Sequence, residues 1–124
     1  MIQVGTQLQV SDNSGAKIVE CVKVLNKTRG NYGRIGDVLV VTVKEIVKKQ
    51  KSKVKKGHMY KALVLETAAP QKRQDGSFYR SQRNATALLT AQGTPLGTRI
   101  QGISFYELRQ KNYAKILSLS VTNI

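Results

Sequence analysis

Short apolar runs, each followed by a cluster of turn-forming residues, constrain the fold of this chain more than any other feature. Runs of this length and composition are typical of strands. Nothing between them has the length of a crossover helix, which a parallel sheet requires. The pattern therefore favours a mainly β fold, a small closed five-stranded antiparallel barrel. The five predicted strands lie at about Thr6–Val10, Ala16–Leu25, Asp37–Val47, Ala62–Leu65 and Ala85–Thr90.

The second predicted strand, Ala16–Leu25, carries apolar residues on both of its faces. Val19 and Cys21 share one face, and Ile18 and Val22 share the other. Such a strand is expected to be covered on both sides over part of its length. Because Cys21 lies in mid-strand among valines, we predict that its thiol packs in the core as a small apolar group.

The C-terminal part of the chain has a different pattern, because glycine and proline interrupt the strands after residue 92. We predict one domain over residues 1–124, with the barrel at about 1–92 and C-terminal helical turns at about 93–124. Ser104–Lys111 has the spacing of a short helix. Its predicted inward-facing residues are Phe105, Leu108 and Tyr113.

The charge of the chain points to a polyanionic partner. It has 21 lysines and arginines against seven acidic residues, a formal net charge of +14. Nucleic acid neutralises such a charge with phosphates and releases condensed counterions on binding. A membrane is the weaker alternative, because no apolar run approaches the ~18 residues of a transmembrane helix. One cysteine makes no internal disulfide, so the fold does not depend on an oxidising compartment.

Lysines are concentrated in one segment, with eight of them between Lys44 and Lys61. No acidic residue lies between Glu45 and Glu66 to neutralise them. We interpret the segment as a loop or projecting hairpin between two core strands that follows phosphates rather than reading bases. A solvated charged loop is the alternative interpretation.

The turn at Asp12-Asn13-Ser14-Gly15 combines side-chain acceptors with a glycine, so its main-chain amides could approach a ribose or a phosphate closely. A plain hairpin turn explains the same residues equally well. The arginines are dispersed along the chain, which suggests a broad RNA-facing surface instead of one pocket.

Catalytic chemistry finds no support in the residue pattern. The acidic residues are scattered, and the single histidine, His58, lies in a different segment from Cys21. No triad, paired-acid site or metal cage is assembled. We predict a protein that is not an enzyme and that uses no cofactor and no metal.

Ordered segments along essentially the whole chain carry a resemblance to a known family. They are Met1-Ile2-Gln3, Asp12 to Lys17, Cys21 to Leu25, Ile35 to Val38, Val43 to Glu45, Lys53 to Gly57, Lys61-Ala62, Asp75 to Ser77, Asn84-Ala85, Leu88-Leu89, Gly97 to Ile100, Glu107 to Arg109 and Lys115-Ile116. With these segments the chain resembles the universal large-subunit ribosomal protein fourteen family.

The resemblance implies a barrel with a projecting β-ribbon and small C-terminal helices, which binds large-subunit rRNA near the subunit interface. It also implies a bridge to small-subunit rRNA, large-subunit protein nineteen as a neighbour, and a ribosome-silencing factor as a possible partner. Together with the charge, it predicts rRNA contacts at Asn13, Ser14, Lys17, Lys23, Arg29, Arg34, Lys44, Lys48, Lys49, Lys51, Lys53, Lys55, Lys56, Lys61, Lys72, Arg73, Arg80 and Arg83. The predicted interface and protein contacts are Arg99, Tyr106, Arg109, Lys111 and Lys115.

The chain departs from the family pattern at several positions. Ser81 stands where an aromatic residue is expected, Arg83 replaces a small residue, and Ala87 replaces a valine. Ile103 replaces a proline and Tyr106 an arginine, and the lysine segment is about two residues longer than in typical bacterial members. These departures, and a start at Met-Ile-Gln without a presequence, favour the mitochondrial matrix, with the bacterial cytoplasm as the alternative.

A second class of function stays open, a free RNA- or DNA-binding regulatory barrel protein. Such a protein stacks single strands on a patch of surface aromatic side chains. The two phenylalanines and five tyrosines of this chain are dispersed, which favours the ribosomal interpretation.

Overall fold

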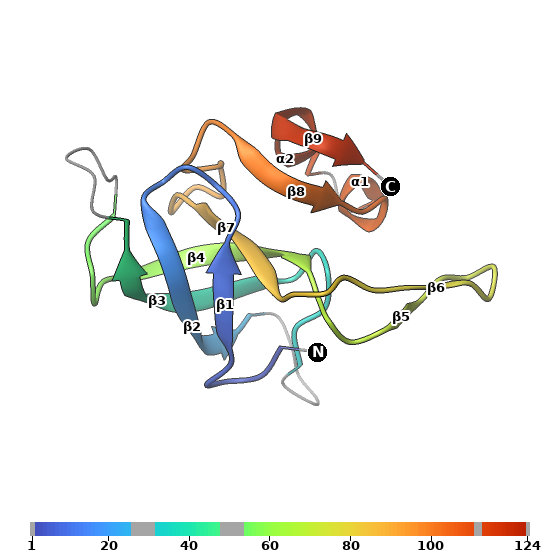
Figure 1. Ribbon diagram of the computed structural model, residues 1–124, viewed down its shortest axis with the longest axis horizontal. Helices are drawn as coiled ribbons and strands as arrows, with labels where there is room; N and C mark the ends of the chain where they lie inside the picture. Colours follow the sequence, from blue (N-terminus) through green and yellow to red (C-terminus); the bar gives the residue numbers. More distant parts are fainter. Residues whose placement is uncertain (1, 26–31, 48–53, 111–112, 124) are drawn as a thin grey trace.

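The computed structural model describes residues 2–25, 32–47, 54–110 and 113–123. Five strands close a barrel in the order β1-β2-β3-β4-β7 (Figure 1), which confirms the predicted mainly β barrel. Each barrel strand overlaps one of the predicted strands. Their bounds are β1 Gln7–Val10, β2 Ala16–Val24, β3 Val38–Ile46, β4 Met59–Glu66 and β7 Ala85–Leu89.

The barrel is antiparallel at every pair of neighbours except one. β1 and β7 run parallel, with Gln9 opposite Ala85 and Val10 opposite Thr86. The prediction of a wholly antiparallel barrel is therefore wrong at this seam. The reason is geometric, because five strands that alternate in direction around a closed ring must leave the first and the last pointing the same way. The parallel pairing is also short and involves only Gln9 and Val10 of β1.

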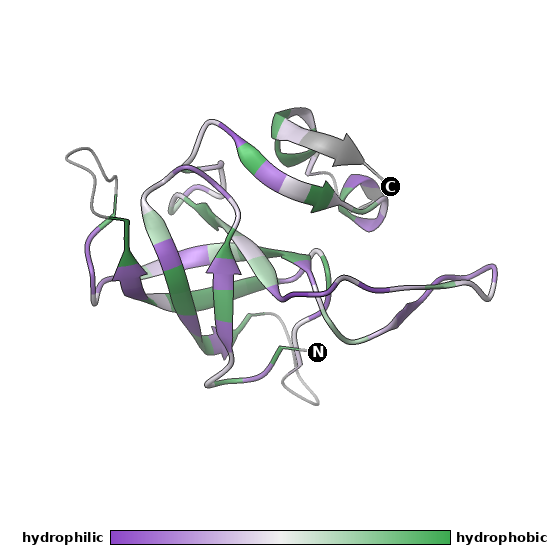
Figure 2. Ribbon diagram, in the orientation of Figure 1, coloured by the Kyte–Doolittle hydropathy of each residue, from purple (hydrophilic) through white to green (hydrophobic). Residues whose placement is uncertain are grey.

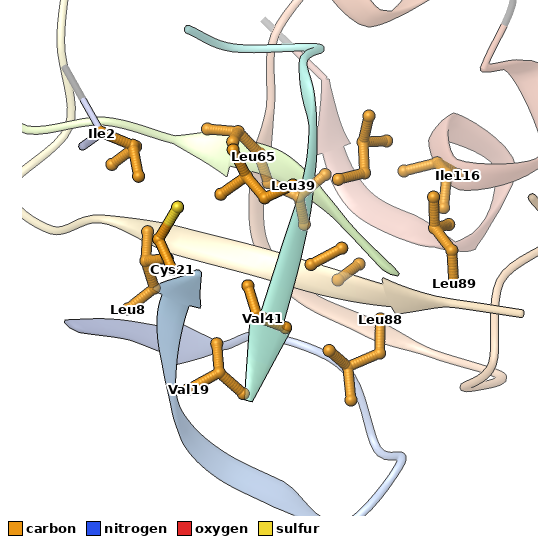
Figure 3. Close-up of a cluster of buried hydrophobic side chains, with 14 of the residues drawn as sticks. Ile2, Leu8, Val19, Cys21, Leu39, Val41, Leu65, Leu88, Leu89 and Ile116 are labelled. Atoms are coloured by element: carbon orange, nitrogen blue, oxygen red, sulfur yellow. The ribbon is translucent and has the colours of Figure 1, made fainter. Parts of the chain in front are cut away.

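Alternate side chains of the strands fill the interior of the barrel (Figure 3). Leu8, Val19, Val41 and Leu88 are almost fully buried there, and Cys21 lies among them with 1% of its surface exposed. Burial raises the pKa of the Cys21 thiol, because a low-dielectric core disfavours the thiolate. The prediction that Cys21 packs in the core is confirmed.

The outer face of strand β2 is half-buried at Ile18 and Glu20 and open farther along, so coverage on both sides reaches only the first part of the strand. Val22 on its outer face is 39% exposed, and Lys23 beside it is exposed. The pairing with β3 shifts in register between Cys21 and Lys23. This bulge inserts an extra residue into β2. Val24, which would point outward in a regular strand, is therefore buried in the barrel interior together with Val19 and Cys21.

A two-stranded ribbon projects from the barrel between β4 and β7 (Figure 1), and most of its residues are hydrophilic (Figure 2). It pairs β5, Gln71–Lys72, antiparallel with β6, Phe78–Tyr79. The family resemblance implies a projecting β-ribbon, whereas the residue pattern alone predicts only a connection here, because each strand has two residues. The predicted lysine hairpin between β3 and β4 falls mainly on residues 48–53, which lie outside the described residues.

The C-terminal part packs helices and strands together above one end of the barrel (Figure 1). The helical turns predicted there are confirmed, with Phe105 and Leu108 buried and Tyr113 partly buried. The parallel pair β8 and β9 is an addition that the sequence did not indicate. The bounds are β8 Ile100–Ser104, α1 Glu107–Gln110, α2 Ala114–Leu119 and β9 Ser120–Asn123.

Candidate nucleic-acid interface

Most of the cationic side chains that the structure describes are exposed. Among the predicted rRNA contacts, these are Lys17, Lys23, Arg34, Lys44, Lys55, Lys56, Lys61, Lys72 and Arg80. Among the predicted C-terminal contacts, Arg99, Tyr106, Arg109 and Lys115 are exposed. The predictions for Arg29, Lys48, Lys49, Lys51, Lys53 and Lys111 lie outside the described residues.

Several acidic side chains, by contrast, are used to hold the fold together. Asp12 accepts a main-chain N–H of β7 at 2.9 Å, and Asp37 accepts one at 2.6 Å from the turn before β3. Glu66 and Glu107 each bind an arginine, and Glu66 is almost fully buried. Four of the seven acidic side chains thus bond within the molecule, and the net charge of +14 makes the field around it positive.

The described end of the lysine segment is attached firmly to the barrel. Val54 is buried, and the main-chain N–H of Gly57 donates to the carbonyl oxygen of Val43 at 2.8 Å. The N–H of Lys55 donates to the Tyr60 hydroxyl at 3.2 Å. Lys55 and the neighbouring Lys56 are therefore exposed on a fixed backbone, which lowers the conformational entropy lost when they bind a phosphate.

A second group of cations lies on the outer face of the barrel. Lys23 of β2 is opposite Val40 of β3, and Val40 is opposite Lys61 of β4, which places the two lysines in one row across three strands. Neighbouring strands are about 4.8 Å apart, so the two backbones are separated by roughly 10 Å. Farther along β3, Lys44 lies 3.4 Å from Glu20, a half-exposed ion pair that stabilises the fold little and leaves Lys44 available.

Arg83 does not face the solvent freely, although it was among the predicted rRNA contacts. Its Nε donates to the buried Glu66 carboxylate at 3.0 Å. Its two terminal nitrogens donate to Gln9 Oε1 at 3.3 Å, to Ser11 Oγ at 3.2 Å and to the Gln101 carbonyl oxygen at 3.2 Å. One guanidinium thus joins β1, β4 and β8. The other carboxylate oxygen of Glu66 accepts the hydroxyl of Ser81, a second position at which the chain departs from the family pattern.

Arg73 holds the projecting ribbon against the C-terminal part. Its Nε donates to Glu107 Oε1 at 2.8 Å, and its guanidinium lies 4.5 Å above the Tyr79 ring. The Tyr79 ring in turn lies 4.8 Å from the ring of Phe105. The hydrogen bond to Glu107 raises the pKa of Arg73. Burial, followed by the charge and hydrogen bonding of Glu107, raises the pKa of Tyr79 to about 12.

The turn between β1 and β2 binds another part of the same chain. Asn13 Nδ2 donates to Thr98 Oγ1 at 2.8 Å, and Asn13 Oδ1 accepts the main-chain N–H groups of Thr98 and Arg99 at 2.7 and 3.2 Å. Ser14 is fully buried, and its hydroxyl donates to Asp12 Oδ1 at 2.6 Å. The turn therefore anchors the segment before β8, a role that local sequence pattern does not reveal.

The described residues contain no group of three or more histidine, cysteine or acidic side chains that could hold a metal ion. His58 is exposed beside the lysine segment, whereas Cys21 is enclosed in the barrel. Within the same residues, no helix is long and apolar enough to cross a membrane.

Fold and surface together define a small, strongly basic β-barrel protein in which four acidic side chains bond within the chain and most of the described cations face the solvent. The sequence model of one family, described as Ribosomal protein L14p/L23e, matches residues 1–124. The chain belongs to this family, which confirms the resemblance described above. It is a structural protein of the large ribosomal subunit, and the family is not an enzyme family.

Proposed function

We propose that this protein binds large-subunit rRNA through its exposed lysines and arginines and stabilises RNA segments that would otherwise repel each other. The observation that carries the proposal is the large excess of exposed cationic side chains over exposed acidic ones among the described residues. The described carboxylates Asp12, Asp37, Glu66 and Glu107 bond within the chain, and a net charge of +14 remains for the surface. Cations on a rigid barrel neutralise phosphates where RNA helices converge.

Finer assignments rest on the family resemblance. We propose that the protein lies near the subunit interface, contributes to a bridge with small-subunit rRNA, and has large-subunit protein nineteen as a neighbour. Arg99, Tyr106, Arg109 and Lys115 are candidates for protein contacts, including one with a ribosome-silencing factor, and all four are exposed. The departures at Ser81 and Tyr106 lead us to propose a mitochondrial rather than a bacterial large subunit.

Charge reversal in the lysine segment tests rRNA binding. Replacing Lys53, Lys55 and Lys56 with glutamate should weaken binding to purified large-subunit rRNA. If all three contact phosphates, the slope of log affinity against log salt should become shallower by about two to three, since each contact contributes about 0.7–0.9. Lys55 and Lys56 are exposed, so folding should be unaffected.

The matched control replaces the same three lysines with arginine, which keeps the charge. It should bind rRNA with the slope of the unmodified protein. Equal slopes for the glutamate and arginine variants would show that this segment is no RNA anchor. Binding that does not respond to salt at all would contradict the proposed function as a whole.

The alternative, a free regulatory nucleic-acid-binding protein, is less well supported. The exposed aromatic side chains lie on separate segments, Tyr32 before β3, Phe78 on the ribbon and Tyr106 before α1. A regulator that stacks single strands needs such rings gathered in one groove. We therefore favour a role within the assembled subunit.

A further inference from the structure

A cleft opens in the seam of the barrel, where β1 meets the segment that enters β7. Its cause is the short parallel pairing, which begins only at Gln9 and Ala85. Beside Gln7 the neighbouring chain is not a strand, so the two segments separate. The cleft has a volume of about 310 Å³ and is lined by Gln7, Leu8, Gln9, Ile18, Gln82, Arg83 and Asn84.

Carboxamide groups dominate the polar lining of this cleft, and two of them are held in place. Asn84 Oδ1 accepts the main-chain N–H of Ala68 at 2.9 Å, which leaves its Nδ2 group as a donor. Gln9 Oε1 accepts Arg83, which leaves the Gln9 Nε2 group as a second donor. Within the described part of the chain, no hydrogen bond engages the side chains of Gln7 and Gln82, so both offer a donor and an acceptor.

The electrostatics of the cleft differ from those of the rest of the surface. Its one cation, Arg83, is matched by Glu66 at 3.0 Å, so the lining is close to neutral. A phosphate is therefore attracted more strongly to the unpaired lysines elsewhere. Apolar atoms of the half-buried Ile18 lie beside the carboxamides. A ligand that fits this lining has flat apolar faces and an edge of alternating donors and acceptors.

We propose that the seam cleft binds an unpaired nucleobase of RNA, a proposal that rests on the proposed function of RNA binding. Carboxamides pair with base edges in a bidentate manner, and RNA is read mainly through unstacked bases that insert into protein pockets. The volume of the cleft is at the lower end of the ~300–1,000 Å³ of small-molecule sites, a size suited to one base. The lysines hold the phosphates, and the cleft adds selectivity for an unstacked base at one point.

The experiment compares two RNA strands of equal charge. Full-length protein labelled with nitrogen-15 is titrated with single-stranded RNA hexamers and with abasic hexamers that carry the same phosphates. The side-chain amide signals of Gln7, Gln9, Gln82 and Asn84 should shift with a base-bearing hexamer and stay in place with the abasic one. Main-chain signals around Lys55 and Lys56 should shift with both.

A variant pair provides the matched control. Gln7→Leu combined with Gln82→Leu should lower the affinity of the protein for the base-bearing hexamer by about fivefold or more, which is the loss expected when one good base-edge contact is removed. Binding of the abasic hexamer should not change. Gln3→Leu combined with Gln92→Leu alters two exposed glutamines outside the cleft and should leave both hexamers unaffected.

The outcomes separate this inference from the proposed function. If both hexamers shift the lysine signals and neither shifts the cleft amides, RNA binding stands and the base site is refuted. If neither hexamer binds even at low salt, both proposals fail. Cleft signals that respond only to a peptide ligand would also overturn the base site, because they would assign the cleft to a protein partner.

Discussion

Replacing Arg83 with alanine should destabilise the protein strongly, although Arg83 lies at the protein surface, beside the seam between β1 and β7. The side chain is 36% exposed, but the Glu66 carboxylate that it binds is only 5% exposed. Alanine removes the charge partner of a buried acid together with the three weaker contacts to Gln9, Ser11 and Gln101. The substitution thus leaves a buried carboxylate with the Ser81 hydroxyl as its remaining described partner.

The magnitude follows from these contacts. A hydrogen bond to a charged group contributes about 1.5–3 kcal/mol, and the loss of a partner from a buried ion pair costs about 3–5 kcal/mol. Solvent screening at the half-exposed guanidinium reduces this cost, so we expect about 3 kcal/mol. For a domain of this size that corresponds to a fall in melting temperature of roughly 10 °C.

Urea denaturation and thermal melting of purified Arg83→Ala measure the effect directly. Arg80→Ala is the matched control, since Arg80 is exposed and has no ion pair within the described residues. It should change the free energy of unfolding by less than about 0.5 kcal/mol. Equal stability of the two variants would refute the reasoning, because it would mean that the network around Glu66 contributes nothing to the seam.

Two further perturbations address other contacts. Asn13→Ala removes the hydrogen bonds to Thr98 and Arg99 and should lower the free energy of unfolding by about 1–2 kcal/mol. Hydrogen exchange should become faster at the main-chain amides of Thr98 and Arg99. Unchanged exchange would show that the turn does not anchor this segment. Tyr79 has its pKa raised from 10 to about 12 in the folded state, so its contribution to stability is complete below pH 10 and is lost as pH rises toward 12. Tyr79→Phe should therefore lose less stability than the unmodified protein over that range in urea titrations, and parallel losses would contradict the assignment.

The barrel was predictable because its strands are short apolar runs bounded by turn residues, and in β1 and β3 buried positions alternate with more exposed ones. Leu8 and Val10 of β1 show the pattern, and every barrel strand overlaps a predicted one. The local residue pattern does not show which distant segments pair with each other. For this reason neither the parallel seam between β1 and β7 nor the two-residue strands of the ribbon followed from the local residue pattern, although the family resemblance implied a ribbon.

The exposed lysines were predictable as well, since a long cationic side chain is rarely buried without a partner. The arginines were harder to assign, because the partners that place Arg73 and Arg83 are far away along the chain. Glu107 is 34 residues from Arg73, and Glu66 is 17 residues from Arg83. A usable signal was the scarcity of acidic residues, which makes each one a candidate for an internal ion pair.

The seam cleft was invisible for a similar reason. Gln7 and Gln82 look like ordinary surface residues, and only the short pairing of β1 with β7 brings them to one opening. At the turn around Asn13 the sequence did indicate a special role, but not the correct partner. Its residue types indicated either a hairpin or an RNA contact, whereas its hydrogen bonds go to Thr98 and Arg99.

Sedimentation of a native extract through a sucrose gradient tests the central claim most directly. At moderate salt the protein should travel with the large subunit, with no free pool near the top of the gradient, and stepwise increases in salt should release it. Large subunits that lack this protein, or a protein that stays soluble and unbound at low salt, would contradict a cationic barrel neutralised by ribosomal RNA.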